Sequence, residues 1–295
     1  MSMDPMKLDD ININPKVRAQ LLLAAAMRGA DSAAAACQVF ENTHARGCLV
    51  PMGITSENVA AKFGVPREAQ DALAAQSHAR ALAARSSGRF KDEIVAVHTV
   101  QKDANGDARE VVVSEDDGIR PGVTAAQLSK LPPAFRKGGT TTAGNSSQVS
   151  DGAGAVLLAR RSYAAAHRLP VLGVWRTFAV VGCDPEIMGI GPALAIPRAL
   201  QAAGLGVDDV ALYELNEAFA SQATYCQKKL GLKPERINVN GGAIALGHPL
   251  GATGARCVAT LLHELRKRGP EARYGVISMC IGSGMGAAAV LERGD

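Results

Sequence analysis

The sequence predicts an α/β protein whose layered domain covers residues 162–295. After residue 161, short apolar segments typical of buried strands alternate with longer segments in which apolar residues recur at helical spacing. Such alternation is typical of a sheet with helices packed on it. The part before residue 162 carries helix signals and a hairpin signal, which indicate a separate α+β unit. A chain of 295 residues accommodates about two domains.

The composition is that of a folded globular protein. Hydrophobic residues make up 47% of the chain and charged residues 20%, which argues against a disordered protein. The net charge of +4 and the aromatic content of 4% give no support to a nucleic-acid partner. The apolar run at 21–27 ends at Arg28 and is too short to cross a bilayer, so we expect no membrane partner.

The cysteines predict neither a disulfide framework nor a metal site. None of the six belongs to a C-x-x-C pair, which favours a reducing compartment and argues against zinc. We therefore expect no bound metal. The six are Cys37, Cys48, Cys183, Cys226, Cys257 and Cys280.

Three helices and a hairpin are predicted in the first half. An alanine-rich helix is possible over 18–40 on propensity alone. A second helix runs to Lys62, with Thr55 or Ser56 as its cap. A third runs from Pro66, which suits the first helical position, to about residue 85. Segments 93–100 and 110–114 are rich in β-branched residues and flank an Asn-Gly turn at 105–106, which predicts a hairpin.

The second half predicts a regular succession of strands and helices. Strands are expected over 171–181, 210–215, 274–279 and 287–291, with a short extended piece at 237–239. Helices are expected over 193–203, 217–230 and 252–268, the first two ending at Gly204 and Gly231. Pro197 is expected to kink the start of the first of these helices.

The segment 216–220 places a polar residue at a strand-to-helix junction. Asn216 follows a buried strand, and in open α/β sheets the carboxyl ends of strands carry the sites. Asn216 can therefore hydrogen-bond a ligand or a water. A helix cap is an equally simple explanation of an asparagine at this position.

The segment 241–254 is a glycine-rich loop around a histidine. His248 lies between Gly247 and Pro249, just before a predicted helix. Glycines allow close backbone approach and positive φ, and the proline stiffens the loop. A histidine framed in this way is a candidate acid, base or oxyanion donor, and a structural loop residue is the alternative.

The segment 280–286 places a cysteine at the end of a buried strand. Cys280 is followed by glycines that alternate with other residues from Gly282. The backbone amides of such a loop can form an anion nest or an oxyanion hole. A small buried apolar side chain is the commonest role of a free cysteine. The spacing is not that of a dinucleotide-binding loop.

Together, Asn216, His248 and Cys280 indicate acyl or carbon–carbon chemistry on a thioester. All three lie at strand ends of one predicted α/β domain, so they can converge on one pocket. A histidine and an amide-held water stabilise an enolate oxygen. A cysteine moves a proton to or from carbon or sulfur.

With these three segments in place, the sequence resembles the thiolase family, and within it the peroxisomal 3-ketoacyl-CoA thiolases of plants. Segments 52–60, 117–121 and 142–147 match as well, and the resemblance covers about residue 47 to the end. It implies a thiolase-like layered fold with a complete C-terminal half that has a mixed sheet. It also implies a loop domain at 1–118, a remnant of the N-terminal half at 119–161, and the C-terminal half at 162–295.

The resemblance also implies an activity and roles for single residues. Thiolases of fatty-acid β-oxidation cleave a 3-ketoacyl-CoA with CoA as co-substrate, giving acetyl-CoA and a shortened acyl-CoA, with no permanently bound cofactor. His248 then activates the nucleophilic cysteine and binds the thioester oxygen, Asn216 holds a water, and Cys280 is the acid/base, with Gly282 and Gly247 supporting the oxyanion sites. Residues that match the CoA and acyl channel are Ser147, Met52, Phe135, Met188 and Phe219, with Asn145 supporting that wall. Family members are homodimers, and a peroxisomal location follows by resemblance.

The sequence departs from the family pattern in its first half. Family members carry the nucleophile in a Cys-Ser-Ser-Gly-like setting, whereas Cys37 and Cys48 have other neighbours. Residues 18–42 look inserted. We therefore expect a chain that is truncated relative to the family, that carries no targeting signal and that performs no thiolysis alone.

Three other functions remain open on the sequence. A non-catalytic acyl-CoA-binding module would keep the channel wall without the chemistry. A hydrolase would use Cys280 as its nucleophile, although no base lies beside it in the sequence. A ketoacyl synthase shares the fold but has a second histidine where this chain has Cys280.

Overall fold

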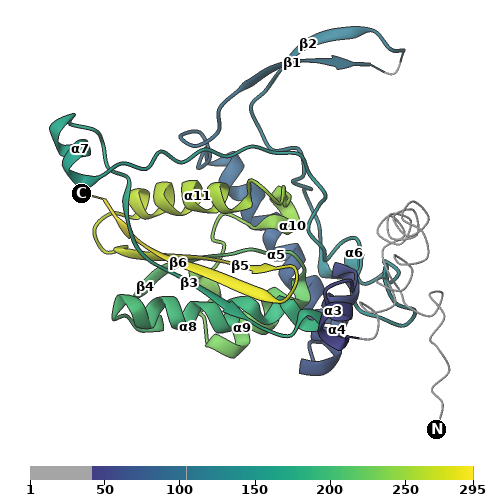
Figure 1. The fold of residues 1–295 in the computed structure, drawn as a ribbon. Coiled ribbons are helices and arrows are strands. Elements are labelled where there is room, and N and C mark those ends of the chain that lie inside the picture. Colours follow the sequence, from purple (N-terminus) through teal and green to yellow (C-terminus); the bar gives the residue numbers. More distant parts are fainter. Residues whose placement is uncertain (1–41, 104, 295) are drawn as a thin grey trace, which may run out of the picture.

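A four-stranded mixed sheet forms the centre of the molecule (Figure 1). The computed structural model describes residues 42–103 and 105–294. The strands are β3 (Gly173–Gly182), β4 (Val210–Leu215), β5 (Tyr274–Ile281) and β6 (Met285–Arg293), in the order β3-β6-β5-β4. Strands β4 and β5 are parallel, and the other neighbours are antiparallel. The predicted α/β class with a mixed sheet is confirmed.

Helices cover both faces of this sheet (Figure 1). On one face, α8 (Gly191–Ala203) and α9 (Ala220–Leu230) pack with a core that includes Ile196, Leu200 and Tyr213. On the other face, α11 (Thr253–Arg268) packs with a core that includes Leu261 and Leu265. The apolar side chains of α11 lie on one side because they recur at helical spacing.

The first half packs mostly at one end of the sheet, and its last helix lies at the other end (Figure 1). It contains α3 (Thr43–Gly47), α4 (Met52–Phe63), α5 (Arg67–Ser86), α6 (Ala125–Leu128) and α7 (Arg161–Ala166). Strands β1 (Val97–Lys102) and β2 (Ala108–Val113) form the predicted hairpin, which projects from the body, with φ +89° at Gly106 in its turn (Figure 1). Short helices complete the chain: η2 (Pro185–Ile190), η3 (Val207–Asp209), η4 (Pro234–Arg236) and α10 (Ala243–Leu246).

Several element boundaries differ from the sequence prediction. Helix α4 begins at Met52 with Pro51 as its cap residue, so Thr55 and Ser56 lie inside the helix rather than capping it. Ser56 instead bonds the buried hydroxyls of Thr141 and Ser221, at 2.8 and 2.7 Å. Pro66 is the cap residue of α5 and not its first helical residue as predicted, because the helix begins one position later, at Arg67. The predicted helix at 18–40, the cysteine at 37 and nearly all of the predicted insertion lie outside the described residues.

In the described part of the chain, apolar side chains are exposed on β3 and on the stretch before α7, among other places. On the edge strand β3, Trp175, Phe178 and Val180 are 46, 57 and 52% exposed. The apolar stretch at 153–159 forms no strand in the structure, and Leu157 and Leu158 are 88 and 74% exposed. No helix in the described part of the chain has the length and apolar character needed to span a bilayer.

Candidate active site

Asn216 lies where β4 ends, and its side chain is directed at His248. The Asn216 amide donates to the Ser278 carbonyl of the neighbouring strand (2.9 Å), which fixes the backbone at the sheet's edge. The residue is 1% exposed, and its Nδ2 lies 3.3 Å from His248 Nε2. Its Oδ1 is buried and has no hydrogen-bond partner among the described residues. A buried amide oxygen left in this state is a natural partner for a water or a ligand. Asn216 does not cap a helix, because α9 starts at Ala220.

His248 is held by hydrogen bonds on both sides of its ring. Its backbone amide donates to the Gln148 carbonyl (3.1 Å), and its Nδ1 lies 2.7 Å from Thr253 Oγ1. The single hydroxyl proton of Thr253 is donated to the Pro249 carbonyl (3.0 Å), so the hydroxyl accepts from His248 Nδ1–H. The Nε2 atom therefore carries a lone pair toward Asn216 Nδ2.

The environment of His248 favours the neutral ring. Burial lowers the pKa of His248, and the positive charge of Arg256 lowers it further. Both effects disfavour the imidazolium form. At neutral pH the ring is consequently a base with a free Nε2, the form that can take a proton from a thiol.

Cys280 joins the pair through a glutamine that sequence reasoning missed. The Cys280 thiol donates to Gln222 Oε1 (3.7 Å), and Gln222 Nε2 donates to the Asn216 carbonyl (3.2 Å). Burial raises the pKa of Cys280 to about 12, so the thiol is protonated at neutral pH. Gln222 lies in α9, six residues after Asn216, and no local motif marks it.

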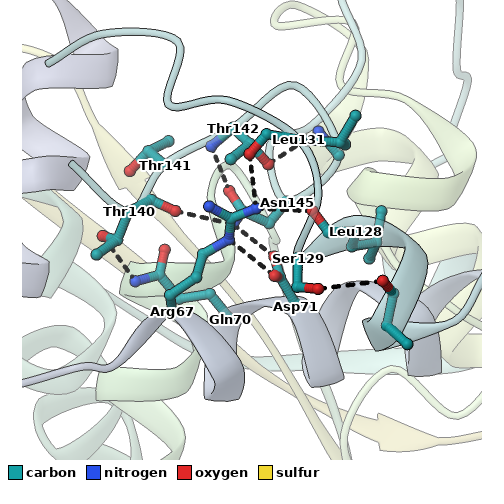
Figure 2. Close-up of polar contacts among 12 residues, drawn as sticks. Arg67, Gln70, Asp71, Leu128, Ser129, Leu131, Thr140, Thr141, Thr142 and Asn145 are labelled. Carbon is teal, nitrogen blue, oxygen red and sulfur yellow. Dashed lines mark hydrogen bonds and ion pairs between the residues drawn. The ribbon is translucent and has the colours of Figure 1, made fainter. Parts of the chain in front are cut away.

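The loop at 140–147 clamps the segment that follows Asn216. The Ser147 amide donates to the Ala218 carbonyl (3.0 Å), and the Ala220 amide donates to the Asn145 carbonyl (2.9 Å). Figure 2 shows how the Asn145 side chain is fixed: its Nδ2 donates to Asp71 Oδ1 (3.0 Å), and Asp71 pairs with Arg67 (2.7 Å). A charge-assisted network of this kind rigidifies the loop.

Two aromatic rings from the predicted channel wall meet. Phe135 and Phe219 pack edge to face, with ring centroids 6.1 Å apart. Gly53 lies directly beneath the Phe135 ring, where a Cβ would approach a ring carbon to 2.2 Å. Its neighbour Met52 is 39% exposed at the start of α4. The structure thus brings Phe135 and Phe219 together beside the loop that carries Ser147.

The remaining predicted residues occupy separate positions. Met188 is buried in η2, where its carbonyl accepts from the Cys183 thiol (3.9 Å). Gly282 begins the tight β5–β6 turn, and a Cβ there would meet open space. Gly247 has φ +93°, and a Cβ there would lie 2.3 Å from Ser150 Oγ, so both backbone and space require glycine.

The loop after His248 borders a pocket of about 380 Å³. Segments 150–154 and 249–252 line it. The site therefore consists of a base, a buried amide and a protonated thiol, set beside an aromatic wall and an open pocket. In the described part of the chain, no group of His, Cys, Asp and Glu side chains is arranged to hold a metal ion.

Comparisons with known proteins agree with this arrangement. Residues 20–162 match the thiolase N-terminal domain, and residues 169–293 match the thiolase C-terminal domain. The chain is 67% identical over 252 residues to 3-ketoacyl-CoA thiolase 2, peroxisomal, of Arabidopsis thaliana, which covers 85% of this chain and 54% of that protein. It is 62% identical over 255 residues to the human peroxisomal 3-ketoacyl-CoA thiolase, a match that covers 86% of this chain and 60% of that protein.

Solved structures show the same fold. The dimeric peroxisomal thiolase of Saccharomyces cerevisiae superposes with a TM-score of 0.78 at 52% identity, over 87% of this chain and 62% of that one. Human mitochondrial 3-ketoacyl-CoA thiolase in complex with CoA gives a TM-score of 0.78 at 45% identity. The superposition covers 83% of this chain and 60% of that one. The chain thus spans little more than half the length of these proteins. Its fold, its two matched domains and these relatives together establish that this chain belongs to the thiolase family.

Proposed function

We propose that this chain supplies the thioester-binding and proton-transfer part of a 3-ketoacyl-CoA thiolase site. The observation that carries the proposal is the pairing of Asn216 with His248 at 3.3 Å, with Asn216 Oδ1 buried and unpartnered among the described residues. Once Nε2 has taken the proton of a thiol, such a pair can bind a thioester oxygen through Nε2–H and through a water held by Asn216. Cys280 completes the set within reach of Gln222.

The protonated state of Cys280 suits the cleavage direction. When a nucleophilic cysteine has added to the keto carbon of a 3-ketoacyl-CoA, the bond between C2 and C3 breaks, and acetyl-CoA leaves as its enolate. The Cys280 thiol gives its proton to C2 of that enolate and becomes a thiolate. The thiolate then takes the proton of an incoming CoA thiol, whose sulfur attacks the acyl-enzyme and restores the free nucleophile. Atoms and charges balance over the cycle.

His248 acts at the other end of the same reaction. Its free Nε2 takes the proton of the attacking thiol and then donates it as a hydrogen bond to the thioester oxygen. Thr253 accepts a hydrogen bond from Nδ1–H, so the neutral ring adopts the single tautomer in which Nε2 carries the lone pair. The single tautomer makes the base available without a prior proton shift.

The names of the relatives support a substrate, a location and an assembly. The plant and human relatives are named peroxisomal 3-ketoacyl-CoA thiolases, and a human mitochondrial relative was solved with CoA. We therefore assign 3-ketoacyl-CoA and CoA as substrates, fatty-acid β-oxidation as the process and the peroxisome as the location. The yeast relative is described as dimeric, which supports a homodimer.

Binding experiments separate this proposal from a non-catalytic acyl-CoA-binding module. Calorimetry would compare acetyl-CoA with CoA for the wild-type chain, Asn216→Ala and His248→Ala, with acetoacetyl-CoA turnover assayed in the same samples. The water held by Asn216 and the protonated form of His248 are the donors to the thioester carbonyl. Each substitution should therefore weaken acetyl-CoA binding by about 2–10-fold while sparing CoA. Equal effects on both ligands would favour the binding module, and no binding of either ligand would contradict the proposal.

A further inference from the structure

The carboxylate of Glu217 is buried between three segments of the chain. Glu217 directly follows Asn216 and is 4% exposed. It accepts hydrogen bonds from Ser77 Oγ (2.7 Å), Asn238 Nδ2 (2.8 Å) and the Ile244 amide (3.3 Å). A buried carboxylate with three donors is fully bonded and geometrically fixed.

The turn that leads to His248 packs directly on this carboxylate. A Cβ on Gly242 would lie 2.2 Å from the Glu217 carboxyl carbon, so only glycine allows this approach. The Gly242 amide donates to Ser77 Oγ (3.0 Å), and the same hydroxyl donates to Glu217. The 242–247 turn is therefore connected to Glu217 at two points. Gly242 is connected through the Ser77 hydroxyl, and the Ile244 amide donates to the carboxylate directly.

Ser77 belongs to a buried polar stripe on α5. The stripe consists of Gln70, Asp71, Ser77 and His78, which are at most 5% exposed and recur at helical spacing. Asp71 fixes the Asn145 side chain (Figure 2). The Asn145 carbonyl in turn accepts from the Ala220 amide and so fixes the segment after Asn216. One helix of the first half thus supports both loops of the site, through Asp71 on one side and Ser77 on the other.

We propose that Glu217 and Ser77 are positioning residues, which set the His248 ring against Asn216 by fixing the 242–247 turn. Neither residue touches a reacting atom. The proposal deepens the proposed function and rests on it for the meaning of the His248 geometry, but the geometry itself is measurable without turnover.

The test compares two substitutions that each remove a buried hydroxyl, one bonded to the 242–247 turn and one in α11. Ser77→Ala removes a buried hydroxyl that donates to Glu217, and Thr260→Ala removes one in α11 that donates to Glu93 (3.0 Å). Both substitutions delete a hydroxyl-to-carboxylate hydrogen bond. NMR of the full chain would record the pKa of His248 and its tautomer, from the 15N shifts of the ring.

Ser77→Ala should move the pKa of His248 up toward its ordinary value of 6.5 and mix its tautomers, because a loosened turn admits water to the ring. Thr260→Ala should leave both readouts unchanged. Unchanged readouts in Ser77→Ala, or equal changes in the two variants, would overturn the proposal.

A second variant keeps the test decisive if Ser77→Ala does not fold. Glu217→Gln preserves the shape but places an amide NH2 against a donor, so the single His248 tautomer should again be lost. A retained single tautomer would overturn the proposal. Because these readouts need no ligand, a negative binding or turnover result would count against the proposed function and leave this inference standing.

Discussion

At the scale of single residues, the site depends on partners that fix one orientation of each functional group. Thr253 sets the His248 tautomer, and Gln222 links the Cys280 thiol to the Asn216 backbone. The sequence pointed to Asn216 and Cys280 because each lies at the end of a predicted strand, and to His248 because glycines and a proline frame it. It could not point to Gln222, because a glutamine inside a helix has no local signature and its role appears only when α9 lies against β5.

Gly247 provides a test of the loop that carries His248. Gly247→Ala should lower the free energy of unfolding by about 2–4 kcal/mol, because a positive φ and a clash with Ser150 act together. Gly269→Ala is the matched control, since Gly269 has a similar backbone conformation (φ +82°, ψ −165°) but open space at the Cβ position, and should cost about 1–2 kcal/mol. Urea unfolding measures both, and equal losses would show that the Ser150 contact is unimportant.

At the scale of elements, local patterns located most strands and helices, and tertiary contacts shifted their ends. Strand β4 has its predicted bounds, and α8 ends at Gly204 in the left-handed conformation, as predicted. Helix α9 starts three residues later than predicted because Glu217 turns to Ser77 and Asn238, and Phe219 pairs with Ser146. Helix propensity contains no information on such long-range partners. Here these contacts, and not the propensity, determine where the helix begins.

A second group of buried charged residues lies where α11 contacts both the sheet and the loop that follows α5. Glu214 in β4 pairs with Arg256 in α11 (2.9 Å), and Glu93 bonds Thr260 in the same helix. Burial raises the pKa of both Glu93 and Glu214 to about 7, against the opposing charge of Arg256. A carboxyl whose pKa is raised in the folded state favours folding while it keeps its proton.

The pH dependence of stability follows from the sign of these shifts. Unfolded carboxyls ionise near 4.5, so the contribution of Glu93 and Glu214 is fully present below pH 4.5 and is lost as pH rises through about 7. Glu214→Gln should flatten the fall in stability between pH 5 and about 8. Denaturant unfolding over this range measures the slope. An unchanged slope in Glu214→Gln would contradict the assignment.

At the scale of the whole molecule, two groups of apolar side chains near the well-packed sheet are exposed to solvent. Trp175, Phe178 and Val180 lie on the edge strand β3, and Leu157 and Leu158 lie on the strandless stretch before α7. The sequence indicated a strand-like run at 171–181 but could not tell a covered face from an open one, because apolar residues alone do not say what covers them. Exposed patches of this kind mark association surfaces.

The open surfaces predict how the isolated chain behaves in solution. It should bind a hydrophobic dye such as ANS in its native state and self-associate as concentration rises. Phe178→Ser combined with Leu157→Ser should reduce both effects, whereas Val95→Ser, an 83% exposed valine before the hairpin, should not. Dye fluorescence and sedimentation velocity provide the measurement. A monodisperse monomer that binds no dye would contradict this reading of the surfaces.

The central claim is that Asn216, His248 and Cys280 form one proton-transfer site for a CoA thioester. Deuterium uptake at the methyl group of acetyl-CoA in D2O, followed by mass spectrometry, tests it most directly, because removal and return of a proton at C2 needs no acyl acceptor. The thiolate form of Cys280 removes the C2 proton, and the raised pKa of about 12 keeps that form scarce at neutral pH, so uptake should exceed that in buffer and should grow faster as pH rises. Cys280→Ala should abolish the excess uptake, and Cys257→Ala, which changes a buried cysteine in the α11 core, should retain it. Uptake no faster than in buffer, or equal loss in the two cysteine variants, would contradict the claim.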